Sequence, residues 1–110
     1  MSTATAYAIS FFILSPQRGI NRQTVAVPDG FKITDVIADV PADSTLDLLD
    51  AGNSVFGPRP LGGGIFSTAS KKLTLPAPKE VKNTSLELVV ECNSEPSKPI
   101  GVAVLGYTGE

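Results

Sequence analysis

Short β-rich runs, each ended by proline or glycine, constrain the fold of this chain more than any other feature. Ten Gly and nine Pro recur between the runs, and no long window has apolar residues at helical spacing. Short strands with such turn signals are typical of a sandwich or a barrel. We expect eight strands, at 5–14, 22–27, 31–40, 45–50, 54–56 resuming at 65–68, 71–75, 85–92 and 99–107. The pattern predicts an all-β fold, an eight-stranded antiparallel jelly-roll sandwich. An immunoglobulin-like sandwich is the alternative, although its Cys–Trp–Cys pattern is missing.

Several of these runs show which side chains face inward. In SLELVVEC (85–92) the even positions are apolar and Glu87 and Glu91 lie on the other face, as in a half-buried strand. In 31–40 the apolar parity changes after Ile33, which predicts a β-bulge near Thr34 and Asp35. The first and last strands are apolar on both parities, so we expect each to be central or covered by a partner.

Composition narrows the possible functions. At 110 residues the chain is predicted to be a single β-sandwich domain over 1–110. Its net charge is −2, and its nine basic residues are scattered from Arg18 to Lys98, which gives nucleic-acid binding no support. The apolar segment 6–14 is too short for a membrane helix and has no basic residue before it, unlike a signal peptide. We therefore expect no membrane association, and a protein that stays, or is assembled, where it is made.

Residues suited to catalysis or metal binding are scarce. The chain has no histidine, so a Ser-His-Asp or Cys-His arrangement and a His-ligated metal site are excluded. The single cysteine, Cys92, falls on an apolar strand face and is predicted to be a small buried hydrophobe. We expect no enzymatic activity and no cofactor.

Five aspartates fall within sixteen residues of one another and raise the question of a carboxylate site. They are Asp35, Asp39, Asp43, Asp47 and Asp50. Their spacing is not that of a calcium loop, and most point away from the apolar faces or lie in turns. We interpret them as surface residues and predict no bound metal. A calcium site and an acid/base pair are the alternatives.

Two segments are candidates for contact with other subunits. Phe11 and Phe12 place apolar groups on both faces of the first strand. The loop GPRPLGGG (57–64) follows Phe56 and contains Arg59 and Leu61 between prolines and glycines. This loop is interpreted either as a flexible connection or as an arm that orders against a neighbouring subunit.

The run TVAVPDGFKITDVIADV…STLDLLDAGN, closing with SKPIGVAVLGY, resembles small jelly-roll virion proteins of tailed bacteriophages. The likeness covers roughly residues 24 to 107 and is broken by GPRPLGGG. It implies a capsid decoration (cement) protein that binds the capsid exterior and stabilises contacts between capsomers. The implied partners are the major capsid protein or other virion subunits. The implied state is a homo-oligomer, with a trimer favoured, located in the virion after assembly in the host cytoplasm.

A carbohydrate- or receptor-binding module of a fibre or adaptor is the alternative function. Sugar-binding platforms rely on the flat faces of Trp and Tyr. The chain has no Trp and two Tyr, which counts against this alternative.

Overall fold

The structure is a computed structural model that describes residues 4–56, 61–62 and 72–109. Within these ranges the chain is all-β and contains no helix. The strands are β1 (Thr5–Ile13), β2 (Gly19–Ala26), β3 (Lys32–Asp39), β4 (Thr45–Asp50), β5 (Asn53–Ser54), β6 (Leu61–Gly62), β7 (Lys72–Glu80), β8 (Ser85–Cys92) and β9 (Ile100–Thr108). The predicted fold class is therefore correct at the level of an all-β sandwich.

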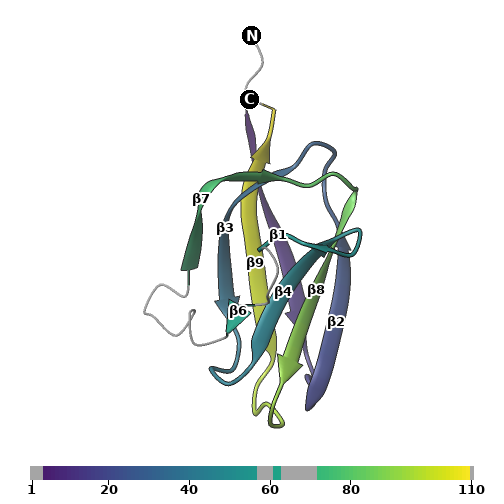
Figure 1. The fold of residues 1–110 in the computed structure, drawn as a ribbon, viewed down its shortest axis with the longest axis vertical. Coiled ribbons are helices and arrows are strands. Elements are labelled where there is room, and N and C mark those ends of the chain that lie inside the picture. The colour runs from purple at the N-terminus through teal and green to yellow at the C-terminus, as the bar shows by residue number, and fades with distance from the viewer. Residues whose placement is uncertain (1–3, 57–60, 63–71, 110) are drawn as a thin grey trace.

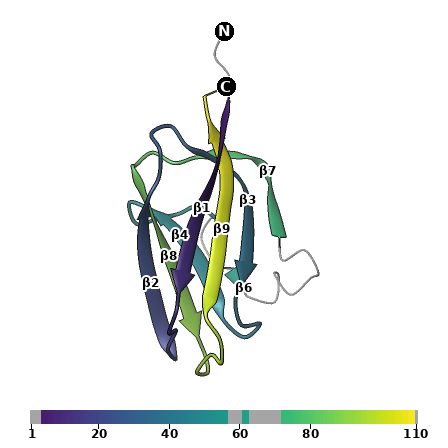
Figure 2. The same cartoon turned by 180° about the vertical axis from the view of Figure 1, so that it is seen from behind.

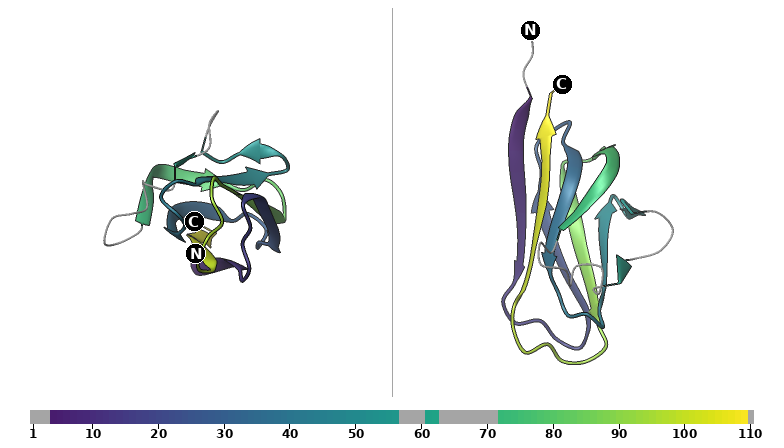
Figure 3. Two further views of the ribbon diagram at one scale, coloured as in Figure 1. Left: turned by 90° about the horizontal axis from the view of Figure 1, so that it is seen from below. Right: turned by 90° about the vertical axis from the view of Figure 1, so that its left-hand side faces the viewer.

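Two antiparallel sheets pack face to face (Figures 1 and 3). In the described part of the chain one sheet has the order β1-β9-β3-β7 and the other the order β2-β8-β4-β5, with β6 also paired to β4. The molecule measures 50 × 28 × 26 Å. The start of β1 and the end of β9 lie at the same end of the long axis, where Thr5 pairs with Thr108 (Figure 2).

Alternating side chains of both sheets fill the space between them. In β8, Leu86, Leu88 and Val90 are fully buried and Cys92 nearly so, while the residues between them face outward. In β4, Leu46 and Leu48 are equally buried, and Phe31, Val36 and Val104 meet them from the other sheet. The inward parity predicted for 85–92 and the buried state predicted for Cys92 are confirmed.

The predicted bulge in the third strand is also present. The register of β3 shifts between Ile33 and Asp35 against both of its neighbours, β7 and β9. Because of this shift Ile33 and Val36, which differ in parity, are both fully buried. The hydroxyl of Thr34, at the bulge, has two acceptors within reach of its single proton, a carboxylate oxygen of Asp35 (2.9 Å) and the Leu105 carbonyl (3.3 Å).

The first and last strands were expected to be central or covered by a partner, and the structure shows a central place for the last strand alone. Strand β9 is central and lies between β1 and β3. Strand β1 is an edge strand, paired only with β9. Its apolar residues on the inner face enter the core, and those on the outer face are left exposed.

Most predicted boundaries differ from the structure by one to three residues, and two strands differ more. Strand β7 was expected to end at 75, before Pro76, but it continues to Glu80 through Pro76 and Pro78. Proline is tolerated there because β7 is an edge strand. The interrupted fifth strand begins as β5 at Asn53, and its continuation at 65–68 lies outside the described residues.

Candidate interaction surface

The exposed half of β1 is the most conspicuous surface feature among the described residues. Four consecutive residues, from Thr5 to Ala8, are exposed, so both faces of the strand are open there. Figure 2 shows this part of β1, beside β9, extending beyond the end of β2. The exposed large apolar side chains among the described residues are Tyr7 (39%) and Phe12 (55%) on β1, Leu14 (69%) just after it, and Ile20 (58%) at the start of β2. Because exposed apolar side chains are common at interfaces, this region is the candidate interaction surface.

The backbone of β1 also presents unpaired hydrogen-bonding groups at this edge. The Phe12 N–H points away from β9 and donates to Oε1 of Gln23 in β2 (2.7 Å). In an antiparallel pair the residues whose N–H and C=O point away from the partner alternate along the strand. The backbone groups of Ala6, Ala8 and Ser10 therefore point away from β9 too, toward the open edge.

The structure places the interface candidates predicted from the sequence in different environments. Phe11 is only 1% exposed and packs in the core, so its prediction as an interface residue is wrong. The alternation of β1 turns Phe11 inward and leaves Phe12 outside. Phe56 is half-buried and packs against the core. Arg59 lies outside the described residues, and Leu61 is described only as part of β6, paired with Leu46.

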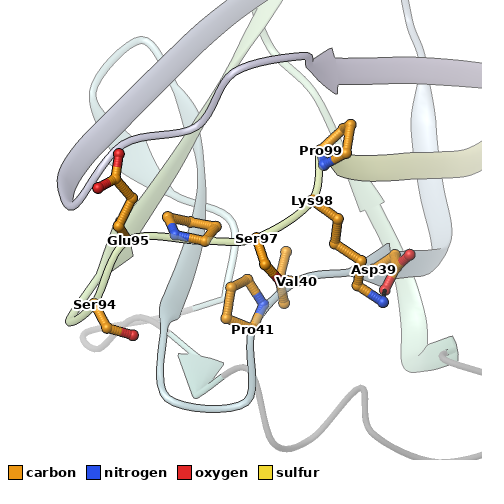
Figure 4. Close-up of a pocket in the computed structure, with 9 residues that line it drawn as sticks. Asp39, Val40, Pro41, Ser94, Glu95, Ser97, Lys98 and Pro99 are labelled. Atoms are coloured by element: carbon orange, nitrogen blue, oxygen red, sulfur yellow. Dashed lines mark ion pairs between the residues drawn. The ribbon is translucent and has the colours of Figure 1, made fainter.

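A hollow of about 210 Å³ lies at the opposite end of the sandwich from the termini. It is bounded by the end of β3 with the turn that follows, and by the loop 93–99 before β9 (Figure 4). Lys98 Nζ lies 3.9 Å from a carboxylate oxygen of Asp39 across it. Pro41 and Pro99 supply rigid apolar walls. Lys98 and Asp39 form an exposed ion pair, and Glu95 adds a further carboxylate to the lining.

The described aspartates do not converge on one point. Asp47 accepts a hydrogen bond from the Ser54 hydroxyl (2.6 Å), and the exposed Asp43 accepts one from the Ser94 hydroxyl (3.1 Å). Asp35 is bound by the Thr74 hydroxyl (2.6 Å) at the junction of β3 and β7. Among the residues that the structure describes, no three acidic or cysteine side chains are placed to hold a metal ion. The alternative of a calcium site gains no support.

Asp50 departs from the surface interpretation. It is 9% exposed, and its carboxylate accepts hydrogen bonds from the Lys82 N–H (2.8 Å), the Asn83 N–H (3.2 Å) and Asn83 Nδ2 (2.8 Å). Burial alone raises the pKa of Asp50, but these hydrogen bonds and the nearby Lys79 charge outweigh it and lower the pKa. The sequence shows Asn83 in the turn before 85–92, a residue able to bind a carboxylate, but it does not show that Asp50 is the partner.

Cys92 has the surroundings of an unreactive thiol. Its side chain is 2% exposed. Burial, together with the nearby Asp43 carboxylate, raises the pKa of this thiol above its ordinary value. The geometry gives it a packing role.

No family model, no curated protein and no solved structure matches this chain. Among the described residues there is no helix of the length and apolarity that a membrane crossing requires.

Proposed function

We propose that this chain is a non-enzymatic virion structural protein of a tailed bacteriophage, a capsid decoration (cement) protein. In this role it binds the capsid exterior, with the major capsid protein or other virion subunits as partners, and stabilises contacts between capsomers. It is placed in the virion after assembly in the host cytoplasm, as a homo-oligomer. The resemblance of residues 24–107 to such proteins supports the proposal.

The strand pairing is the observation that carries the proposal. First pairs with last (β1 with β9), second with second-last (β2 with β8), third with β7, and β4 with β5 and β6. This is the order that results when one long antiparallel ribbon is rolled into two facing sheets, which is the winding of a jelly roll. We therefore propose the jelly roll as the topology of the sandwich. Jelly rolls are common in viral capsid proteins.

The described surfaces favour contact over chemistry. The exposed groups of β1 are apolar or small, and apolar groups gather at interface cores. The hollow at the other end is bounded by prolines and an exposed ion pair. Arg59 and Leu61 remain candidates for the interface on sequence grounds.

The proposal is tested on virions and capsids of the source. We expect mass spectrometry of gradient-purified virions to detect the chain at a fixed ratio to the major capsid protein. Purified protein added to capsids that lack it should saturate them and raise their calorimetric melting temperature. Absence from purified virions, or failure to bind such capsids, contradicts the proposal. Binding to host glycans instead would favour the fibre or adaptor alternative.

A pair of variants tests which surface is used. Replacing Phe12 and Leu14 by Ser removes exposed apolar groups and should lower capsid occupancy at limiting protein concentration. Ala26→Ser, exposed at the end of β2, is the control and should leave occupancy unchanged. Equal occupancy of both variants would remove the β1 end from the capsid interface.

A further inference from the structure

We propose that β1 pairs with β1 of a second copy of this chain, antiparallel and edge to edge. This pairing joins the two four-stranded sheets into one continuous sheet across a two-fold axis. It concerns how the chain associates with itself, and it holds whether or not the virion role does.

The edge of β1 from Thr5 to Ser10 lacks the sequence features by which soluble proteins usually prevent edge pairing, and its Phe12 end lies against Gln23 of β2. Such edges are usually interrupted by bulges or prolines, carry inward-pointing or lysine charges, or are very short. Strand β1 has nine residues in unbroken register with β9, from Thr5 with Thr108 to Ile13 with Ile100. It contains no proline, and no charged side chain precedes Arg18 in the sequence. A straight, neutral edge of this length favours the addition of another strand.

The other described edge strands are protected against pairing, which leaves β1 of a second copy as the strand that can pair with β1. Strand β7 contains Pro76 and Pro78, which lack N–H donors, and its register with β3 is broken there. Strand β5 has two residues, and β2 carries the charged Arg22 on its exposed face. Among these edges only β1 itself offers a free, regular and uncharged ladder. A second β1 is therefore the complementary partner, and neither copy brings a charge that the other must oppose.

The direction of the backbone groups sets the register. Ala6, Ala8 and Ser10 present their N–H and C=O groups to the open edge, whereas the Phe12 N–H is already bound by Gln23. A two-fold axis at Ala8 pairs Ala8 with Ala8 and Ala6 with Ser10, and it stops before Phe12. These are small residues, so their side chains do not hinder the approach of the second strand.

The same register improves the packing on the inner face. With the axis at Ala8, Tyr7 of one copy lies opposite Ile9 of the other. Tyr7 is 39% exposed and contacts Phe31 edge to face, with ring centroids 6.4 Å apart. A second copy would cover this ring from its open side, and aromatic side chains beside β-branched ones stabilise cross-strand pairs. The pairing thus removes from water both the backbone edge and part of an exposed aromatic ring.

Charge exchange at residue 8 tests the pairing with the purified full chain. Sedimentation velocity, across about a hundredfold range of concentration because small interfaces bind weakly, should detect wild-type dimers that dissociate on dilution. In Ala8→Lys and in Ala8→Glu, like charges would oppose each other at the axis, so each variant alone should be monomeric. An equimolar mixture of the two should form dimers again. Ala8 is exposed, so both variants should keep the wild-type melting temperature within a few degrees.

Thr24→Lys is the matched control. Thr24 is exposed, and its backbone N–H also points to an open edge, because the neighbouring ladder includes the bond from the Val27 N–H to the Thr84 carbonyl (2.9 Å). This variant should dimerise as the wild type does.

Several outcomes would overturn the inference. They are a wild-type protein that stays monomeric at every concentration, dimers that persist in both Ala8 variants, a mixture of the two that remains monomeric, and a Thr24→Lys variant that loses dimers as Ala8→Lys does. Because no capsid enters the experiment, its failure is distinct from a failure of the virion proposal.

Discussion

At the scale of single residues, Asp50 links two parts of the chain that are distant in sequence. It ends β4, and its three hydrogen bonds go to Lys82 and Asn83 in the turn that leads into β8. Two of the donors are backbone N–H groups whose bonds to the buried Asp50 carboxylate are partly buried, although Lys82 and Asn83 are themselves exposed, and a donor left unpaired there is costly. The carboxylate thus replaces the hydrogen bonds that water would otherwise make to this turn.

Replacement of Asp50 by Asn should destabilise the fold by about 1–3 kcal/mol at neutral pH, because at least one donor loses its acceptor. The folded pKa of Asp50 lies below its ordinary value of 3.8. Its stabilising effect is therefore complete above that value and is lost as the pH falls through the lower, folded pKa. Urea unfolding should give a gap between wild type and Asp50→Asn that is constant above about pH 5 and narrows below about pH 4.

Asp43→Asn is the control for this prediction. Asp43 is exposed, and in the described contacts its carboxylate accepts one hydrogen bond, from the Ser94 hydroxyl, and none from a backbone donor. Its substitution should change the free energy of unfolding by less than about 0.5 kcal/mol. A gap for Asp50→Asn that does not depend on pH would show that its carboxylate charge is not what stabilises the turn.

Gly106 in β9 provides a second prediction at this scale. A Cβ at this position would overlap the backbone carbonyl of Lys32, next to the bulge of β3, and would press on the Phe31 ring. We expect Gly106→Ala to destabilise the protein by about 1–3 kcal/mol or more through overpacking. Gly101→Ala, in the same strand with no atom within 4 Å of the added Cβ, should be neutral or slightly stabilising. Equal melting temperatures for the two variants would contradict this account.

At the scale of strands, the sequence predicted those features that depend on the residues of one strand alone. The inward face of β8 and the bulge of β3 follow from the parity of apolar residues, which is visible in a short window. Parity does not say which strand lies at an edge, so the sequence did not place β1 at the side of the sheet. It also could not separate the buried Phe11 from the exposed Phe12, because both are aromatic.

Contacts between residues distant in sequence account for the other incorrect predictions. Asp50 was expected at the surface because its donors lie 32 and 33 residues further along the chain, in another turn. Strand β7 was ended too early because proline signals a turn in most contexts, and only its position at an edge permits it within a strand. These features depend on the arrangement of the sheets and not on local sequence.

Strand β8 allows a direct test of the core assignment. Leu88 is fully buried between Gln23 of β2 and Leu48 of β4, its partners in the sheet. Leu88→Asp would bury an unpaired charge and should cost more than about 4 kcal/mol, much of the stability of a small domain. Val89→Asn, one residue along and on the outer face, should cost far less. Urea unfolding compares the two, and an unchanged midpoint for Leu88→Asp would contradict the burial of β8.

At the scale of the whole molecule, the pairing of first with last strands joins the two ends of the chain. Thr5 pairs with Thr108 at one end of the sandwich (Figure 2). The sheet β1-β9-β3-β7 therefore cannot be completed until the last strand is in place. Folds dominated by such distant pairings form slowly, in roughly milliseconds to seconds.

This closeness of the ends predicts that a circular permutant will fold. A short Gly/Ser linker would join the present termini, and new termini would open between Glu95 and Pro96, in the loop between β8 and β9. Glu95 is exposed, and loops of this kind are where chains tolerate interruption. We expect the permutant to unfold in one cooperative transition, with a melting temperature a few degrees below that of the native chain.

The matched comparison is a chain truncated after Glu95, which has the same break but loses β9. Without β9 both β1 and β3 lose a neighbour, and that chain should not fold. A truncated chain as stable as the permutant would mean that β9 is dispensable, which its central place in the sheet does not allow.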